Sequence, residues 1–297
     1  MELTTFLTHL IKATEQTGLT IEQVIEKVQS WDIHWLDVED YVLHDPDARP
    51  FEAGHTRFLA GFLRYRPQDT QALYRALDCG MKINSMVSLH DFLHNPSEEA
   101  AVQVVKDAAE VDAKTIMVVP GYAFDGDDMQ KLMETSLKPM KLICDLAGEK
   151  GIRVGVESYD HFRNPTSTEE GMDFYLENIP ELTCIFDTGN FYYRGLDIYR
   201  LFRKYRPRID TMMHCKDRGD RPRDGLTEVP FARADNTLMW PAAAGEGVVP
   251  LKEILTDLAS ENFSGRLAIE NYNSEDFLND IERSARYIKS FFGEEIV

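Results

Sequence analysis

Hydrophobic and polar residues alternate along this chain with two different periods, and segments of the two kinds follow one another in turn. In residues 151–159, Ile152, Val154 and Val156 face one side and the residues between them face the other, which is the period-two pattern of a strand. In residues 20–28, apolar side chains recur every three to four positions, which predicts an amphipathic helix. The chain therefore predicts alternating strands and helices.

Seven strands have clear patterns, and helices are predicted between them. The strands are predicted at residues 33–39, 82–88, 115–119, 151–157, 182–187, 209–214 and 266–270. The helices are predicted at residues 20–28, 67–77, from 96 onward, 127–147, 166–176, 196–205, 251–260 and 275–292. Capping residues support these starts, because Thr20 forms a capping box with Gln23 and Ser97 can cap the helix after Pro96.

The remaining segments have weaker patterns. Residues 3–10 are β-prone and predict a first strand or, alternatively, the beginning of a helix. Residues 44–50 predict a loop, and residues 51–65 predict a helical excursion. Residues 216–250 are polar and predict a long loop that contains the sequence Gly-Glu-Gly.

Eight strand–helix units in one chain predict parallel strands joined by right-handed crossovers. This number of units in roughly 250 residues is typical of a (β/α)8 TIM barrel, an α/β fold, here a single domain over residues 1–297. An open doubly wound sheet is the alternative, but it usually has a glycine-rich phosphate turn after an early strand, and the sequence has none there.

The composition limits the classes of molecule that this protein is expected to bind. The formal net charge of −19 argues against a nucleic-acid backbone and favours the capture of cations. The four cysteines form no CxxC pair, which is typical of reduced thiols in the cytoplasm. The sequence shows neither a signal peptide nor an apolar run long enough to span a membrane. We therefore expect a cytoplasmic protein, with a small-molecule substrate and a possible homo-oligomeric state.

Four predicted strands end in residues that can bind a metal, and barrel enzymes place their chemistry at this end of the strands. A single carboxylate at such a place more often caps a helix or pairs with a base, but four on successive strands predict one divalent metal site. A site of three carboxylates and one imidazole suits Mn²⁺, Mg²⁺ or Co²⁺, and Zn²⁺ is possible. The predicted ligands are Glu157, Asp187, His214 and Glu270.

Other polar residues near the strand ends are candidates for substrate binding. Lys216 and Asp217 follow the histidine of the seventh strand and can contact the substrate or the ligands. His90 follows the third strand, where a substrate contact and a structural role are equally open. Asp37 and Glu39 end the second strand, where a solvated loop is the alternative interpretation.

The chain resembles the xylose isomerase-like TIM-barrel superfamily, which includes sugar phosphate isomerases/epimerases, ketose 3-epimerases, inosose dehydratases and endonuclease IV. The resemblance covers nearly the whole chain and implies the same four metal ligands. Asn190 stands where many members have a substrate-binding histidine, and Asp37 stands where many have glutamate. The resemblance rests on Val156-Glu157, Phe186-Asp187-Thr188-Gly189-Asn190, His214-Cys215-Lys216-Asp217, Gly245-Glu246-Gly247 and Gly265-Arg-Leu-Ala-Ile-Glu270.

The resemblance implies a sugar isomerase or epimerase that transfers a proton next to a carbonyl through a metal-stabilised enediolate. Glu157 and Glu270 would be the catalytic carboxylates, and the absence of an evident phosphate cradle favours a free sugar or polyol. The alternative is a metal-dependent dehydratase acting on a cyclic polyol or keto acid. An endonuclease would need more histidines and a basic face, and a barrel that only binds a ligand would not need the intact ligand set.

Overall fold

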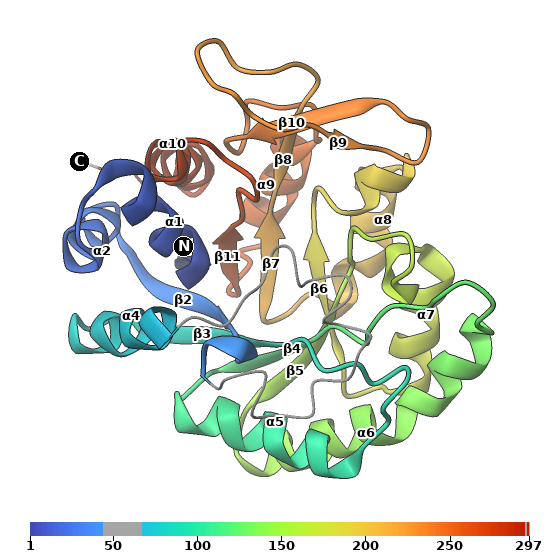
Figure 1. Cartoon of the computed structure of the whole chain (residues 1–297). Coiled ribbons are helices and arrows are strands. Elements are labelled where there is room, and N and C mark those ends of the chain that lie inside the picture. The colour runs from blue at the N-terminus through green and yellow to red at the C-terminus, as the bar shows by residue number, and fades with distance from the viewer. Residues whose placement is uncertain (44–66, 295, 297) are drawn as a thin grey trace.

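The computed structural model describes residues 1–43, 67–294 and 296, and its centre is a closed barrel of eight parallel strands (Figure 1). The barrel predicted from the alternating pattern is thereby confirmed. In order around the barrel, the strands are β1 (Leu3–Phe6), β2 (Ile33–Glu39), β3 (Lys82–Ser88), β4 (Thr115–Val118), β5 (Arg153–Glu157), β6 (Thr183–Asp187), β7 (Met212–Cys215) and β11 (Arg266–Ile269), which closes on β1.

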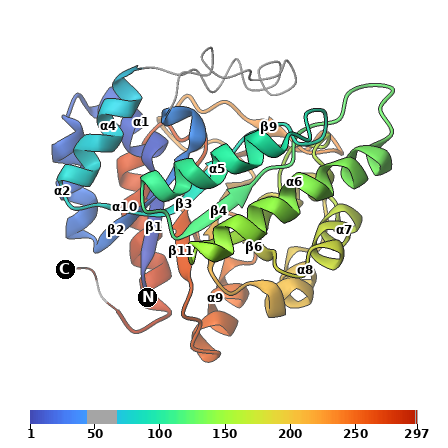
Figure 2. The same ribbon diagram turned by 90° about the horizontal axis from the view of Figure 1, so that it is seen from below.

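Helices surround the barrel on its outside (Figure 2). The capping box at Thr20 is present, and Ser97 accepts a hydrogen bond from the backbone of Ala100, as predicted. The apolar faces of these helices are buried, and each fully buried aliphatic side chain contributes about 1.5–3 kcal/mol. The helices are α1 (Leu7–Thr17), α2 (Ile21–Ser30), α4 (Pro67–Asp78), α5 (Glu98–Glu110), α6 (Met129–Glu149), α7 (Glu169–Asn178), α8 (Ile198–Tyr205), α9 (Leu251–Ser260) and α10 (Phe277–Ser290), with 3₁₀ turns η1 (Asp40–Val42), η2 (Pro165–Ser167), η3 (Phe191–Arg194) and η4 (Arg206–Arg208).

Both interpretations of residues 3–10 are correct in part. The first four of these residues form β1, which pairs with β2 on one side and β11 on the other. The helix α1 begins at the very next residue, Leu7. Because a β-prone run passes directly into a helix, the sequence pattern there carries both periods.

The segment between β7 and α9 differs from the predicted loop. It contains a three-stranded antiparallel sheet in the order β8 (Asp217–Gly219), β10 (Leu238–Ala242) and β9 (Phe231–Ala232), which Figure 1 shows beyond the end of β7. These strands are two to five residues long. Strands this short are too brief to show a clear alternation, so the sequence pattern predicted only a loop.

The loop predicted at residues 44–50 and the helical excursion predicted at 51–65 lie outside the described residues. Among the helices of the described part, none has the length and the hydropathy that a bilayer span requires.

Candidate metal centre

The four predicted ligands come from four neighbouring strands at one end of the barrel. Glu157 and Asp187 are the last residues of β5 and β6, and Glu270 directly follows β11. His214 lies in β7 and pairs in register with Asp187. Because the strands are parallel and adjacent, residues far apart in the sequence meet at one rim.

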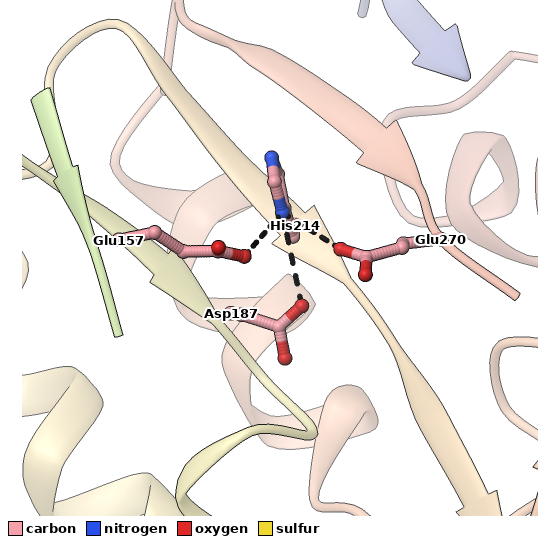
Figure 3. Close-up of side chains that lie close together, drawn as sticks. All are labelled: Glu157, Asp187, His214 and Glu270. Carbon is pink, nitrogen blue, oxygen red and sulfur yellow. Dashed lines mark ion pairs between the residues drawn. The ribbon is translucent and has the colours of Figure 1, made fainter. Parts of the chain in front are cut away.

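One ligand-type atom from each of these residues lies within 4.8 Å of the others (Figure 3). The imidazole stands between the carboxylates, with His214 Nδ1 2.9 Å from Glu157 Oε1 and 2.8 Å from Glu270 Oε2. Asp187 Oδ2 lies 3.8 Å from the same nitrogen. All four side chains are buried, so solvent does not screen these charges.

The short distances at this centre are not accompanied by well-formed hydrogen bonds. Among the described residues, His214 Nδ1, Asp187 Oδ2 and Glu270 Oε2 are buried and form no hydrogen bond of good geometry. Close approach without hydrogen-bond alignment places one polar atom of each residue around a common region. Buried polar atoms normally find partners, and a cation in this region would satisfy all three.

Neighbouring residues orient the carboxylates. The Lys216 ammonium lies 2.6 Å from Glu270 Oε1, 3.2 Å from Asp187 Oδ2 and 2.7 Å from Asn190 Oδ1. Asn190 Nδ2 donates to the Ser158 carbonyl at 2.8 Å. The other oxygen of Asp187 accepts from the backbone of Gly189 and Asn190, so that carboxylate has one fixed oxygen and one that faces the centre.

The charges at this centre strongly perturb one another. Burial raises the pKa of Glu157, and His214 offsets this only in part. Burial also raises the pKa of Asp187 well above its ordinary value. For Glu270 burial acts in the same direction, but Lys216 and His214 hold its pKa well below the ordinary value. Burial alone would lower the pKa of His214, but Glu157 and Glu270 hold it well above 6.5.

A cavity of about 740 Å³ opens above this centre. Its volume falls within the range of about 300–1,000 Å³ typical of small-molecule sites. Four of the predicted site residues line it: Glu157, Asn190, Lys216 and Glu270. The centre and the cavity therefore form one continuous site.

Asp37, which was expected to bind substrate, does not line this cavity. Its carboxylate is fully buried inside the barrel and accepts hydrogen bonds from Thr4, from Asn84 at 2.7 Å and from Ser85 at 2.6 Å. Glu39, two residues later on the same face of β2, lines the cavity instead. Burial raises the pKa of Glu39 to about 8.

Asp217 and His90, also expected to bind substrate, lie outside the lining as well. Asp217 accepts four backbone hydrogen bonds, from residues 218, 245, 247 and 249. These contacts hold the Gly245-Glu-Gly247 turn. The motif that ends in Asp217 and the motif of this turn are therefore parts of one arrangement. His90 Nε2 lies 3.0 Å from the carbonyl oxygen of Asn95, and its ring packs against Phe92.

Several cavity residues were not predicted. Tyr272 lies two positions after Glu270, in the turn that follows β11, where no strand periodicity marks it. Arg194 and Tyr193 belong to the η3 turn, and Phe231 and Arg233 belong to the segment predicted as a loop. Their positions depend on long-range packing, so no local pattern could reveal them.

Comparisons with known proteins agree with this architecture. A family model described as xylose isomerase-like TIM barrel matches residues 51–291. The inosose dehydratase of Bacillus anthracis is 25% identical over 194 residues, which are 63% of this chain and 62% of that protein. The chain thus matches less than two thirds of that relative's length.

Solved structures show the same fold at low identity. The D-psicose 3-epimerase with D-tagatose from Clostridium cellulolyticum H10 has a TM-score of 0.63 and 13% identity, covering 99% of this chain and 98% of that one. The IOLI protein with a bound zinc atom has a TM-score of 0.64 and 15% identity, with the same two coverages. At these identities the likeness concerns the fold alone.

Proposed function

Because the chain belongs to the xylose isomerase-like TIM barrel family, we propose that it is a divalent-metal-dependent sugar isomerase or epimerase. The observation that carries this proposal is the convergence of four ligand-type atoms within 4.8 Å beneath a cavity that two of the same carboxylates line. Such a site can place a sugar carbonyl next to a cation and next to two bases. The substrate would be a small sugar or polyol.

The residues at the centre fit a divalent cation. Three carboxylate oxygens and one imidazole nitrogen form the donor set, and three of these atoms are otherwise without hydrogen bonds. Glu157, Asp187, His214 and Glu270 would hold it, and Mn²⁺, Mg²⁺ and Co²⁺ suit the set, with Zn²⁺ possible. When bound, the cation supplies positive charge that favours loss of a proton next to a carbonyl.

Glu157 and Glu270 are the proposed proton carriers. They come from β5 and β11, which are separated by β6 and β7, so they approach the centre from two sides of His214 (Figure 3). Each has a second carboxylate oxygen besides the one nearest to His214 Nδ1. One residue can remove the proton from the substrate carbon, and the other can return a proton from the other side.

Lys216 and Asn190 would bind the oxygens of the substrate. Both line the cavity, and the lysine ammonium already bridges Asn190 and Glu270. An ammonium at this place can donate to a hydroxyl or carbonyl oxygen while it keeps Glu270 ionised. The asparagine amide then orients the lysine rather than replacing the histidine of other family members.

Replacing each proton carrier by its amide tests the proposal. In metal-saturated protein, Glu157→Gln and Glu270→Gln should each lower turnover roughly a hundredfold or more, because an amide cannot accept the proton. Epimer formation and exchange of substrate protons with deuterated solvent, measured over a panel of ketoses, provide the readout. Glu253→Gln, at an exposed position on α9, is the matched control. Near-wild-type rates in both site variants would exclude these roles.

A metal-dependent dehydratase of a cyclic polyol or keto acid is the second candidate. The matching inosose dehydratases support it, and so does a buried ammonium within 2.6 Å of a cavity-lining carboxylate. That ammonium can protonate a leaving hydroxyl, which a dehydratase needs and an epimerase does not. An unsaturated product, detected by its ultraviolet absorbance, would select this reaction over epimerisation.

A further inference from the structure

One wall of the cavity carries three arginines, which we call the arginine wall: Arg194, Arg218 and Arg233. Arg194 ends the η3 turn, Arg218 lies in β8, and Arg233 follows β9. The backbone of Ala234 donates to the carbonyl of Tyr193 at 2.9 Å, which fixes the β9 segment against the η3 turn. Two segments distant in the sequence therefore bring these cations together.

Arg218 is the most buried of the three, with 1% of its surface exposed. Its guanidinium carbon lies 5.3 Å from the ring centre of Tyr193 and 5.0 Å from that of Phe231, and both rings line the cavity. Nη1 reaches the carbonyl of Tyr272 at 3.5 Å, while Nε and Nη2 have no hydrogen-bond partner within residues 1–43 and 67–294. A buried guanidinium normally pairs with an acid, because removing a charge from water costs on the order of several kcal/mol per ion.

Each of the two arginines that line the cavity also has an N–H group that no described residue accepts. Arg194 Nη2 donates to the Phe162 carbonyl at 2.5 Å and to Ser167 Oγ at 2.8 Å, but its Nε is buried and has no partner in the part of the chain that the structure describes. Arg233 lies with its guanidinium carbon 4.4 Å from the ring centre of Tyr192, and its Nε is likewise without a partner. Stacking on an aromatic ring holds a guanidinium in place and leaves its N–H groups available.

Acids are scarce at this wall. Among the ion pairs of the described residues, the wall has one carboxylate, Asp235, which lies 3.6 Å from Arg233 and is 56% exposed. Asp160 lines the cavity but lies in no such pair with these arginines. The carboxylates at the floor already face Lys216 and the proposed cation. The wall therefore presents positive charge to the cavity.

Two other cations of this chain, one half-buried and one buried, do pair with acids. The guanidinium of Arg223, which is half-buried, pairs with both Glu228 and Asp280. The buried ammonium of Lys289 pairs with Asp32 and with Glu294. Since the sequence holds 51 acidic residues against 32 Lys and Arg, acids are plentiful, and their scarcity at the arginine wall points to a partner from outside the chain.

We infer that the substrate carries an anionic oxygen group, a carboxylate or a phosphate, which Arg194 and Arg233 bind while the carbonyl end reaches Glu157 and Glu270. This inference rests on the proposed function for the position of the carbonyl end. Planar guanidinium groups bind carboxylate and phosphate oxygens through paired N–H donors, and such bonds are stronger than those to neutral groups. Arg218 lies behind the rings and adds charge without touching the ligand. The neutral sugar expected from the sequence is thereby replaced by a sugar acid or a sugar phosphate.

Calorimetric binding to manganese-loaded protein tests this inference with three probes of similar size: D-fructose, D-fructose 6-phosphate and 2-keto-D-gluconate. At least one anionic probe should bind about tenfold or more tightly than fructose, as expected for one or more charge-assisted hydrogen bonds. A preference for one anion over the other distinguishes phosphate from carboxylate. Equal or weaker binding of both anions overturns the inference.

Variants then locate the effect. Arg233→Met, and the double variant with Arg194→Met, should remove most of the preference for the anion and change fructose binding less than about twofold. Arg286→Met on α10, which removes an exposed arginine of equal charge, should leave the preference intact. A preference that survives in the double variant belongs to the metal centre and overturns the inference. Circular dichroism and the melting temperature identify any variant that fails to fold, and Arg233→Gln, which also removes the charge, then replaces it.

Binding is measured without turnover, so the two proposals can fail separately. If no isomerisation or elimination is ever detected but the preference is present and depends on Arg233, the proposed function fails and this inference stands. If turnover is found for neutral ketoses alone and anions bind no better, this inference fails and the proposed function stands.

Discussion

His9 shows how a single buried side chain can make the stability of the fold depend on pH. Its ring centre lies 4.9 Å from that of Phe277, 5.2 Å from that of Phe6 and 5.4 Å from that of Tyr272. Neither ring nitrogen has a hydrogen-bond partner among the described residues. Burial lowers its pKa to about 3. The nearby charges act in both directions, because Glu270 raises that pKa while Lys216 and His214 lower it further.

The direction of the effect follows from proton binding. Unfolded protein protonates this histidine near pH 6.5, whereas folded protein does so only near pH 3. Between these values the unfolded state binds more protons, so the contribution to stability is complete above pH 6.5 and is lost as the pH falls toward 3. The acid sensitivity from this residue therefore lies within this window.

We predict that His9→Phe changes the unfolding free energy by less than about 1.5 kcal/mol at pH 7, because an aromatic ring of similar size fills the site. The difference in unfolding free energy between the variant and the wild type should shift in favour of the variant between pH 7 and pH 4, by up to about 3 kcal/mol. Urea unfolding at both pH values measures the difference. A stability difference that is the same at pH 7 and pH 4 would contradict the assignment.

At the scale of the element, one carboxylate organises the segment between β7 and α9. Asp217 in β8 accepts backbone hydrogen bonds from Gly245, Gly247 and Val249 at 2.9 to 3.1 Å. A Cβ at Gly247 would lie 2.2 Å from Asp217 Oδ1, so the turn can approach the carboxylate only with glycine there. This turn follows β10, the central strand of the three-stranded sheet, and β8 of the same sheet contains Arg218 of the arginine wall.

We predict that Asp217→Ala destabilises the protein by about 2–4 kcal/mol, because several backbone N–H groups lose their acceptor. Amide hydrogen exchange at residues 245–249 should rise far more than in the barrel strands. Asp220→Ala removes an equal charge from an exposed position of the same segment and is the control. Equal stability of the two variants would show that these hydrogen bonds do not hold the segment.

At the scale of the whole molecule, the candidate metal centre joins strands from one half of the barrel. The side chains of β5, β6, β7 and the end of β11 meet there, and without a cation their buried carboxylates repel one another. A metal that binds the folded state alone should therefore stabilise the entire barrel.

We predict that treatment with a chelator lowers the melting temperature and that Mn²⁺, Mg²⁺, Co²⁺ or Zn²⁺ restores it. At a free metal concentration of about one hundred times the dissociation constant, the gain is about 2.7 kcal/mol, or roughly 4–5 °C for a protein of this size. Asp187→Asn should abolish most of this shift. Metal analysis of gently purified protein provides a second measurement, and a melting temperature unaffected by any of the four ions would refute the metal centre.

The sequence by itself determined the barrel and which residues stand at the ends of its strands. Alternation in residues 151–157, the capping box at Thr20 and the repeated strand–helix order all arise from contacts between near neighbours in the chain, and such contacts leave a readable period. The meeting of four metal-binding residues at successive strand ends then followed from the parallel order of the strands, since parallel strands end at the same rim.

Only the tertiary structure decided how deep each inward side chain lies and what walls the cavity. Asp37 and Glu39 share one face of β2, so the sequence could not distinguish them, but closure of the barrel buries the first among Thr4, Asn84 and Ser85 and leaves the second at the cavity. The arginine wall is assembled by two segments about forty residues apart, and their contact depends on packing that no local period encodes.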